Sequence, residues 1–251
     1  MGVYSSAALV DHYASMIDAD EVSEGVSKTG QNLQRAFVGK SAEDKVGAMR
    51  ALWTAEKLDR YAQYARFIMT ARAAAMLPVS EAVSADVDNL IFSMLTAGYD
   101  TRAAQWAGVA SNAGGAAGER AMAILAVGSP TPLKTFDSGD VSGFDGKSEN
   151  AARLLFAGMA GLGRLSAADI ESMAEDMEVP IGRSTPWTRA IDRAIVAKEA
   201  GTVAVLAAAA LQTTDWAKVR PEYFYRAILG LKQVGLEAEA RMIAAEAVAR
   251  S

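Results

Sequence analysis

The sequence predicts an all-α fold, and three observations support this prediction. About one residue in five is alanine, the residue with the highest intrinsic helix propensity. Apolar residues between Leu58 and Met69 recur three and four positions apart, which places them on one face of a helix. No stretch of four to eight residues alternates apolar and polar side chains as a half-buried strand does. At 251 residues, 51% hydrophobic and 22% charged, the chain is long enough to bury one large or two small cores.

Three or four helices are expected within residues 5–77. The segment Ser41-Ala-Glu-Asp is typical of a helix N-terminus, because Ser can cap the backbone and the acids complement the positive end of the helix dipole. This helix is expected to run to about Trp53. A longer helix is expected from about Thr54 to Leu77, ending before Pro78 because proline has no backbone N–H to donate.

Helical hairpins are expected in the remainder of the chain. Their ranges are Ser84–Ala113, Ser148–Met177, Pro186–Gln212 and Pro221–Arg250, with an unpaired helix, Ala117–Val127, between the first two. Pro186 and Pro221 are expected at first helical positions, where a missing N–H costs nothing.

Five glycines mark the points where one amphipathic run ends and the next begins. They are Gly98, Gly128, Gly163, Gly201 and Gly235, separated by 30, 35, 38 and 34 residues. A left-handed residue at the end of a helix is most often glycine, so we expect these positions to be C-caps. Spacings of this length are typical of helical repeats.

Two of these glycines lie in closely matching segments. Gly98 is followed by Ala103 and Ala110, and Gly235 by Ala240 and Ala247, so each has alanine five and twelve positions later. This pattern resembles the second half of a tetratricopeptide repeat, in which the glycine lies at the turn and the alanines lie where paired helices approach. The resemblance implies helical hairpins stacked as a right-handed α-solenoid with a concave binding surface.

Residues 128–147 interrupt the helical pattern with about twenty turn-forming residues. We expect this loop to separate N-terminal helical repeats, residues 1–127, from C-terminal repeats, residues 148–251, although one continuous solenoid is also compatible with the sequence. Asp137, Asp140 and Asp145 in this loop resemble calcium ligands. Their spacing does not match the helix-loop-helix calcium pattern, so we expect a solvated loop and no metal site.

The composition excludes several classes of site. The chain has no Cys and a single His, which excludes disulfides, thiolate zinc sites and metal sites that need two imidazoles. The net charge of −5 argues against a nucleic-acid partner. The longest apolar run, Val203 to Leu211, is about half the length that spans a bilayer, so no membrane span is expected.

Other candidate chemical groups have simpler interpretations. His12 can act as a general base, but no nucleophile is placed near it by the sequence, so we expect an exposed or capping residue. Glu171, Glu175 and Glu178 are spaced to lie on one face of a helix, which we interpret as a solvated face. The glycine-rich runs at 112–118 and 158–163 lack the Lys-Ser/Thr ending of a phosphate loop, so we interpret them as helix ends or close helix contacts.

Aromatic residues and arginines indicate a binding surface in the last two hairpins. Tyr, Trp and Arg are the usual anchors of protein interfaces. The candidate partner-binding residues are Trp187, Arg189, Trp216, Arg220, Tyr223 and Tyr225. Arg183 lies near Trp187 in the sequence, and Phe224 belongs to the same aromatic group. The alternative is that these rings fill the core between alanine-rich helices.

The sequence therefore favours a non-catalytic helical-repeat scaffold that binds a protein or peptide partner within a larger bacterial assembly, without a cofactor. One alternative is a helical accessory domain of a murein-acting enzyme of the cell envelope, and another is a structural oligomeriser. The location is expected to be cytoplasmic by default, or periplasmic if Met1-Gly2 replaces a removed signal peptide. The oligomeric state is not predicted.

Overall fold

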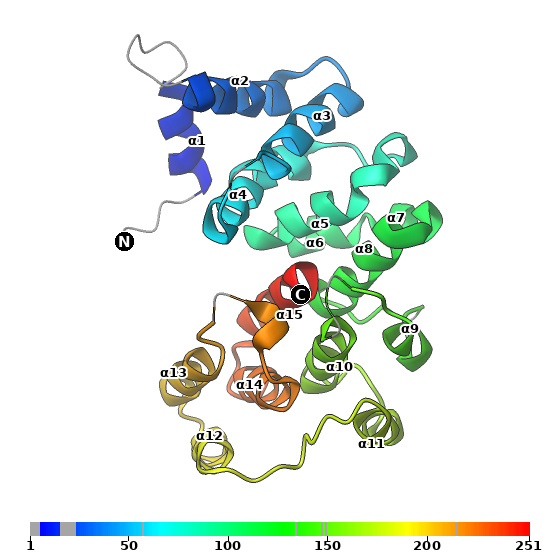
Figure 1. Cartoon of the computed structure of the whole chain (residues 1–251), viewed down its shortest axis with the longest axis vertical. Coiled ribbons are helices and arrows are strands. Elements are labelled where there is room, and N and C mark those ends of the chain that lie inside the picture. The colour runs from blue at the N-terminus through cyan, green and yellow to red at the C-terminus, as the bar shows by residue number, and fades with distance from the viewer. Residues whose placement is uncertain are drawn as a thin grey trace. The chain divides into compact units, whose positions relative to one another are not determined.

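Every regular element in the described part of the chain is a helix (Figure 1). The computed structural model describes residues 6–15, 24–56, 58–133, 135–146, 148, 150–213 and 215–251. The prediction of an all-α fold is confirmed for these residues. The elements are α1 (Ser6–Ser15), α2 (Glu24–Val38), α3 (Ala42–Trp53), α4 (Arg60–Met76), the 3₁₀ helix η1 (Glu81–Asp86), α5 (Val87–Thr96), α6 (Asp100–Ala104), α7 (Ala107–Ala113), α8 (Gly115–Gly128), α9 (Ser138–Ser142), α10 (Ala151–Gly161), α11 (Ala167–Asp176), α12 (Pro186–Val196), α13 (Ala200–Ala210), the 3₁₀ helix η2 (Trp216–Lys218), α14 (Pro221–Gln233) and α15 (Glu237–Arg250).

The chain forms two compact units, Met1–Ala121 and Met122–Ser251. The division lies within α8, whereas the sequence suggested a boundary at residues 128–147. In the structure those residues belong to the second unit and contain a short helix, α9. Val141 on α9 is completely buried, and the following Phe144 is 8% exposed, so apolar side chains anchor this segment.

In the first unit, a buried hydrogen-bond network joins α3, α4 and α5. The indole of Trp53 donates to Thr70 Oγ1 at 2.8 Å, and Thr70 Oγ1 lies 2.9 Å from Ser93 Oγ. Ser93 also donates to the carbonyl of Phe67 at 2.8 Å, and the Phe67 ring stacks on Trp53. Because these buried polar groups find partners, they fix how the three helices pack without a large desolvation cost.

The expected helix starts are partly confirmed. Ser41 caps α3 by accepting from the Asp44 N–H at 3.2 Å, and the helix ends at Trp53 as predicted. The expected start of the next helix at Thr54 is wrong. Thr54 is the C-cap of α3, and α4 begins at Arg60 because Asp59 accepts from the Ala62 N–H at 2.7 Å.

Two of the expected hairpins form as packed pairs in the second unit. Helix α12 packs on α13, and α14 packs on α15, while α13 also packs on α14 (Figure 1). Pro186 and Pro221 begin α12 and α14, as predicted. In the first unit, α5 is followed by two short helices, α6 and α7, instead of one second arm, and the break between them places Trp106 in the core.

The expected hairpin Ser148–Met177 is not a packed pair of this kind. Its first helix, α10, packs mainly on α14 and α15, while α11 lies against α9. Gly161 on α10 faces α14 and allows the two backbones to approach closely.

The predicted C-cap glycines are confirmed at three of five positions. Gly98, Gly163 and Gly235 have φ values of 77°, 65° and 88°, and each ends a helix. The prediction is wrong for Gly128, which is the last residue of α8 but is not left-handed, and for Gly201, which lies in the first turn of α13.

The turn between α12 and α13 is instead made by Lys198. Lys198 has φ 57°, and the Glu199 N–H donates to the Ala194 carbonyl at 3.0 Å. Glu178 adopts a similar conformation after α11, with φ 55°. A non-glycine residue in this region carries a steric cost, and the bond that closes the turn offsets it.

Gly161 lets α10 approach α14 closely. A Cβ atom at this position would lie 2.9 Å from Ile228 Cβ and 3.0 Å from the carbonyl oxygen of Tyr225. At Gly158, a Cβ would also contact side chains, including Phe224 at 3.6 Å. The interpretation of the run 158–163 as close helix contacts and a helix end is therefore confirmed.

We expect Gly161→Ala to destabilise the second unit by about 1–3 kcal/mol, because α10 and α14 would have to separate. Urea unfolding followed by circular dichroism measures this change. Gly201→Ala is the matched control, since nothing lies within 4 Å of a Cβ there. The control should be neutral or stabilising by up to about 1 kcal/mol. Equal stability of the two variants would contradict the close-contact explanation.

Cationic side chains bind the carbonyl ends of several helices. At the end of α8, Arg164 donates to the carbonyls of Ala126 and Ser129, and Arg241 donates to that of Gly128 at 2.8 Å. Similar contacts are made by Arg102 at α4, Arg153 at α11, Lys232 at α10 and Lys198 at α14. Carbonyl groups at helix C-termini have no intrahelical donor, and they lie at the negative end of the helix dipole. The cationic side chains supply the missing donors and also bring positive charge to this end of the helix.

Arg164 retains its contacts at an electrostatic cost. Burial, together with repulsion from Arg241, lowers the pKa of Arg164 to about 10, against the opposing attraction of Glu237. A base whose pKa is lowered on folding carries its full free-energy penalty at every pH below the folded-state pKa, and the penalty is relieved as the pH rises through that value. At neutral pH Arg164 is therefore still charged while it donates to α8, and the desolvation penalty is fully present.

We expect Arg164→Gln to lower the free energy of unfolding by about 1–3 kcal/mol, because buried carbonyls at the end of α8 lose their donors. Arg193→Gln serves as a control that removes the same charge from an exposed position on α12, and it should change stability by less than about 0.5 kcal/mol. If both variants unfold at the same urea concentration, Arg164 is not needed as a cap.

Candidate binding surface

The first turns of α12 and α14 bring Trp187 and Tyr223 together. Their ring centroids are 5.1 Å apart with planes inclined by 59°, and the Trp187 indole donates to the Leu206 carbonyl at 3.1 Å. The guanidinium carbon of Arg220 lies 4.8 Å from the centre of the Tyr223 ring. We call Arg183, Trp187, Arg220, Glu222 and Tyr223 the aromatic–arginine cluster.

Local sequence explains why these helices begin where they do. Thr185 and Thr188 form a reciprocal capping box at the start of α12, with Pro186 in the first turn. Pro221 similarly begins α14 directly after Arg220. Because proline fixes φ near the helical value, Trp187 and Tyr223 are held in rigid first turns.

Glu222 links the two arginines of the cluster. Its side chain is 7% exposed, whereas those of Arg183 and Arg220 are 52% and 50% exposed. Glu222 Oε1 lies 2.5 Å from Arg220 Nη2 and 4.0 Å from Arg183 Nη1. A carboxylate buried beside two surface guanidiniums is compensated for its loss of water, and its short contact orients Arg220 while it attracts Arg183 over a longer distance.

The other candidate residues lie outside the cluster. Arg189 is two residues after Trp187, about 200° around α12, and donates to Ser184 Oγ at 3.2 Å. Trp216 packs edge-on against Phe224 with centroids 6.0 Å apart, and its indole donates to Glu246 at 3.3 Å. Tyr225 lies beside the Arg226 guanidinium at 5.8 Å. Of the six candidates, Trp187, Arg220 and Tyr223 are therefore brought together.

Sequence reasoning did not single out Glu222 or Arg226. An acid directly after Pro221 has the usual pattern of a helix first turn, which gives no sign of burial. Arg226 pairs with Asp192 at 3.2 Å and donates to the Ile181 carbonyl at 3.3 Å, so it ties α14 to α12 and to the segment before it. These are contacts between segments far apart in sequence, and local patterns do not report them.

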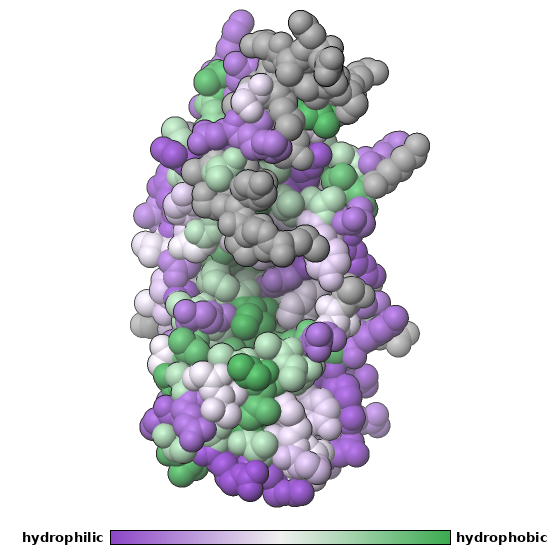
Figure 2. Space-filling view, turned by 90° about the vertical axis from the view of Figure 1, so that its left-hand side faces the viewer, coloured by the Kyte–Doolittle hydropathy of each residue, from purple (hydrophilic) through white to green (hydrophobic). Residues whose placement is uncertain are grey.

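Helix α13, which neighbours both helices of the cluster, presents an uncharged surface. It has no charged residue from Ala200 to Ala210, and its exposed positions are Gly201, Thr202, Val205, Ala208 and Ala209. Figure 2, which views the left-hand side of Figure 1, shows hydrophobic residues gathered in its lower half, at the level of α13. Helix α13 itself therefore contributes no charged side chain beside the aromatic–arginine cluster.

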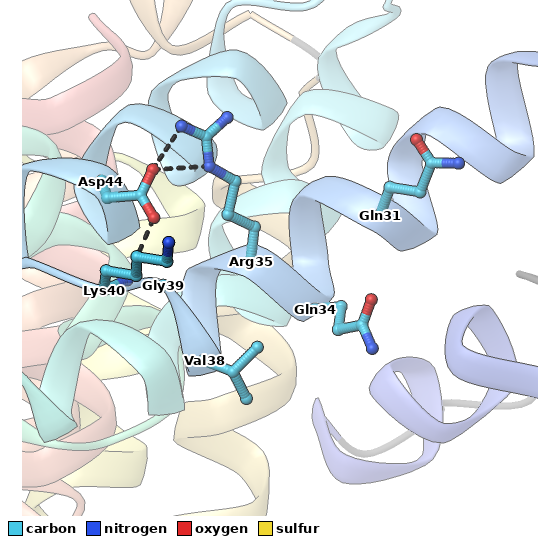
Figure 3. A pocket seen from close by; sticks show the side chains of 7 residues that line it. All are labelled: Gln31, Gln34, Arg35, Val38, Gly39, Lys40 and Asp44. Carbon is cyan, nitrogen blue, oxygen red and sulfur yellow. Dashed lines mark hydrogen bonds and ion pairs between the residues drawn. The ribbon is translucent and has the colours of Figure 1, made fainter.

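The first unit has an open hollow between α2 and α3, with a volume of about 480 Å³. Figure 3 shows Arg35 and Asp44 turned toward each other, with Gln31, Gln34 and Val38 along α2. The Lys40 N–H donates to Asp44 at 3.1 Å, and the hydrogen bond from Arg35 is the main cause that lowers the pKa of Asp44. Arg35 and Asp44 neutralise each other, and they lie on different sides of the hollow. The ion pair therefore joins α2 to α3.

The remaining sequence candidates occupy ordinary positions. His12 is exposed on α1, as expected. Glu171 and Glu175 are exposed on α11, but Glu178 follows the end of the helix in a left-handed conformation. The expectation that all three acids share a helix face is therefore wrong for Glu178.

The aspartates of residues 128–147 are used by the backbone. Asp137 accepts from the N–H groups of Gly139 and Asp140, and Asp140 accepts from the Asp137 N–H at 2.9 Å. Asp145 is exposed beyond the end of α9. Across the described ranges, no three His, Asp or Glu side chains are grouped so as to hold a metal ion.

Comparison with protein-family models, curated proteins and solved structures finds no match to the chain. None of the described helices combines the length and the apolar character needed to cross a membrane.

We expect no calcium binding below millimolar concentrations, because Asp137 and Asp140 already accept backbone hydrogen bonds that begin α9. Isothermal titration calorimetry with calcium chloride tests this expectation. A saturable heat in the micromolar range would show that residues 128–147 rearrange to bind the ion.

Proposed function

We propose that this chain is a non-catalytic helical scaffold that binds a protein or peptide partner through the aromatic–arginine cluster, within a larger bacterial assembly. In this proposal, α12–α15 are two successive hairpins of a solenoid. The order in which they pack, α12 on α13, α13 on α14 and α14 on α15, supports that arrangement. The four alanines of the tetratricopeptide-like pattern support it too, since Ala103, Ala110, Ala240 and Ala247 are all buried.

The observation that carries the proposal is the exposure of Trp187, Arg220 and Tyr223. Both rings are half-buried and Arg220 is half-exposed. Side chains of these types contribute most of the binding energy at protein interfaces when they are rigid before binding. Here the indole hydrogen bond and the contact between the rings hold them in place.

Photo-crosslinking tests the proposal. A benzoylphenylalanine in place of Tyr223 should crosslink to a specific protein in an extract of the source cells, and excess unmodified protein should suppress the product. The matched control replaces Tyr61, a residue of the same type that is 67% exposed in the first unit. Non-specific capture would favour the more exposed position. Identical products from both positions, or none from position 223, would contradict the proposal.

A further inference from the structure

We infer that the partner segment is acidic, with a carboxylate bound by Arg183 and Arg220. This inference rests on the proposed function, because it assigns the chemistry of the segment that the aromatic–arginine cluster takes.

The charge balance of the cluster supports an acidic ligand. Arg183 and Arg220 share a single carboxylate, that of Glu222, which leaves one excess positive charge. The neighbouring Arg226 is balanced by Asp192 at 3.2 Å. The excess charge is at the surface, since both arginines are half-exposed while Glu222 is buried beneath them. A positive surface on a chain of net charge −5 favours acidic segments and orients their approach.

The hydrogen-bonding capacity of the arginines supports the same conclusion. The 4.0 Å separation between Arg183 and Glu222 is too long for a hydrogen bond, so this contact leaves the Arg183 N–H groups available to a ligand. Arg220 donates to Glu222 through Nη2 and lies over the Tyr223 ring, which restricts the guanidinium orientation. Planar guanidinium groups match carboxylates through paired hydrogen bonds.

Glu222 acts as a positioning residue in this scheme. It attracts both arginines from below and makes no contact with the ligand. If the cluster bound acids only through its net charge, removal of the Glu222 charge would tighten binding. If Glu222 positions the arginines, its removal would weaken binding.

Fluorescence anisotropy with two labelled peptides tests the inference. The probe repeats Gly-Glu-Leu-Glu three times, and the reference peptide has Gln in place of every Glu. We expect the Glu peptide to bind about tenfold more tightly than the Gln peptide, with the difference shrinking as salt is added. A labelled oligothymidylate should not compete.

Three variants locate the binding. Arg183→Gln and Arg220→Lys should each weaken Glu-peptide binding about three- to tenfold, the second because lysine keeps the charge but loses the planar fork. Glu222→Gln should weaken binding although it removes a negative charge. The control, Arg72→Gln, removes an exposed charge from α4 and should leave binding unchanged. Thermal unfolding establishes that each variant is folded.

The inference is overturned if near-millimolar protein does not distinguish the Glu and Gln peptides, or if oligothymidylate competes as well as the Glu peptide. It is also overturned if Arg183→Gln binds the Glu peptide as Arg72→Gln does, or if Glu222→Gln binds it more tightly than the unmodified protein. These outcomes are separate from failure of the proposed function. A specific crosslink from position 223 to a neutral or basic segment would support the function while overturning the inference. Selective binding of the Glu peptide without any crosslinked protein would support the preference for acidic ligands and contradict the proposed function.

Discussion

The close contact between α10 and α14 is the constraint on which the second unit depends. Gly161 places the two backbones closer than any side chain would allow, and Gly158 extends the contact along α10. This explains why α10 packs on α14 and α15 although α11 is its neighbour in sequence. Since α14 also carries Glu222 and Tyr223 and begins directly after Arg220, the same contact fixes the position of one half of the aromatic–arginine cluster.

Long-range capping by cations complements this packing. Short helices expose many carbonyl groups relative to their length, and several of these ends are buried. Arginine and lysine side chains from distant positions bind them, as Arg102 does for α4 and Arg164 and Arg241 do for α8. Each such contact joins two segments as well as satisfying a carbonyl. The chain therefore uses part of its positive charge inside the fold and leaves Arg183 and Arg220 at its surface.

Features that depend on a few consecutive residues were predicted well. The cap at Ser41, the proline starts of α12 and α14 and the turns at Gly98, Gly163 and Gly235 are all determined by local backbone chemistry. Prediction failed where a second residue nearby could cap the helix or make the turn equally well. Asp59 caps α4 later than the apolar periodicity suggested, and Lys198 adopts the left-handed conformation expected of Gly201.

The sequence alone determined that the chain is helical and that Trp187, Arg220 and Tyr223 are candidate anchors, because helix propensity, periodicity and residue type are local properties. The tertiary structure decided which of the six candidates meet. It separated Arg189, Trp216 and Tyr225 from the cluster, and it placed Glu222 beneath the two arginines. Burial and charge balance depend on contacts between helices, and alanine-rich helices with similar faces do not specify those contacts in their sequence.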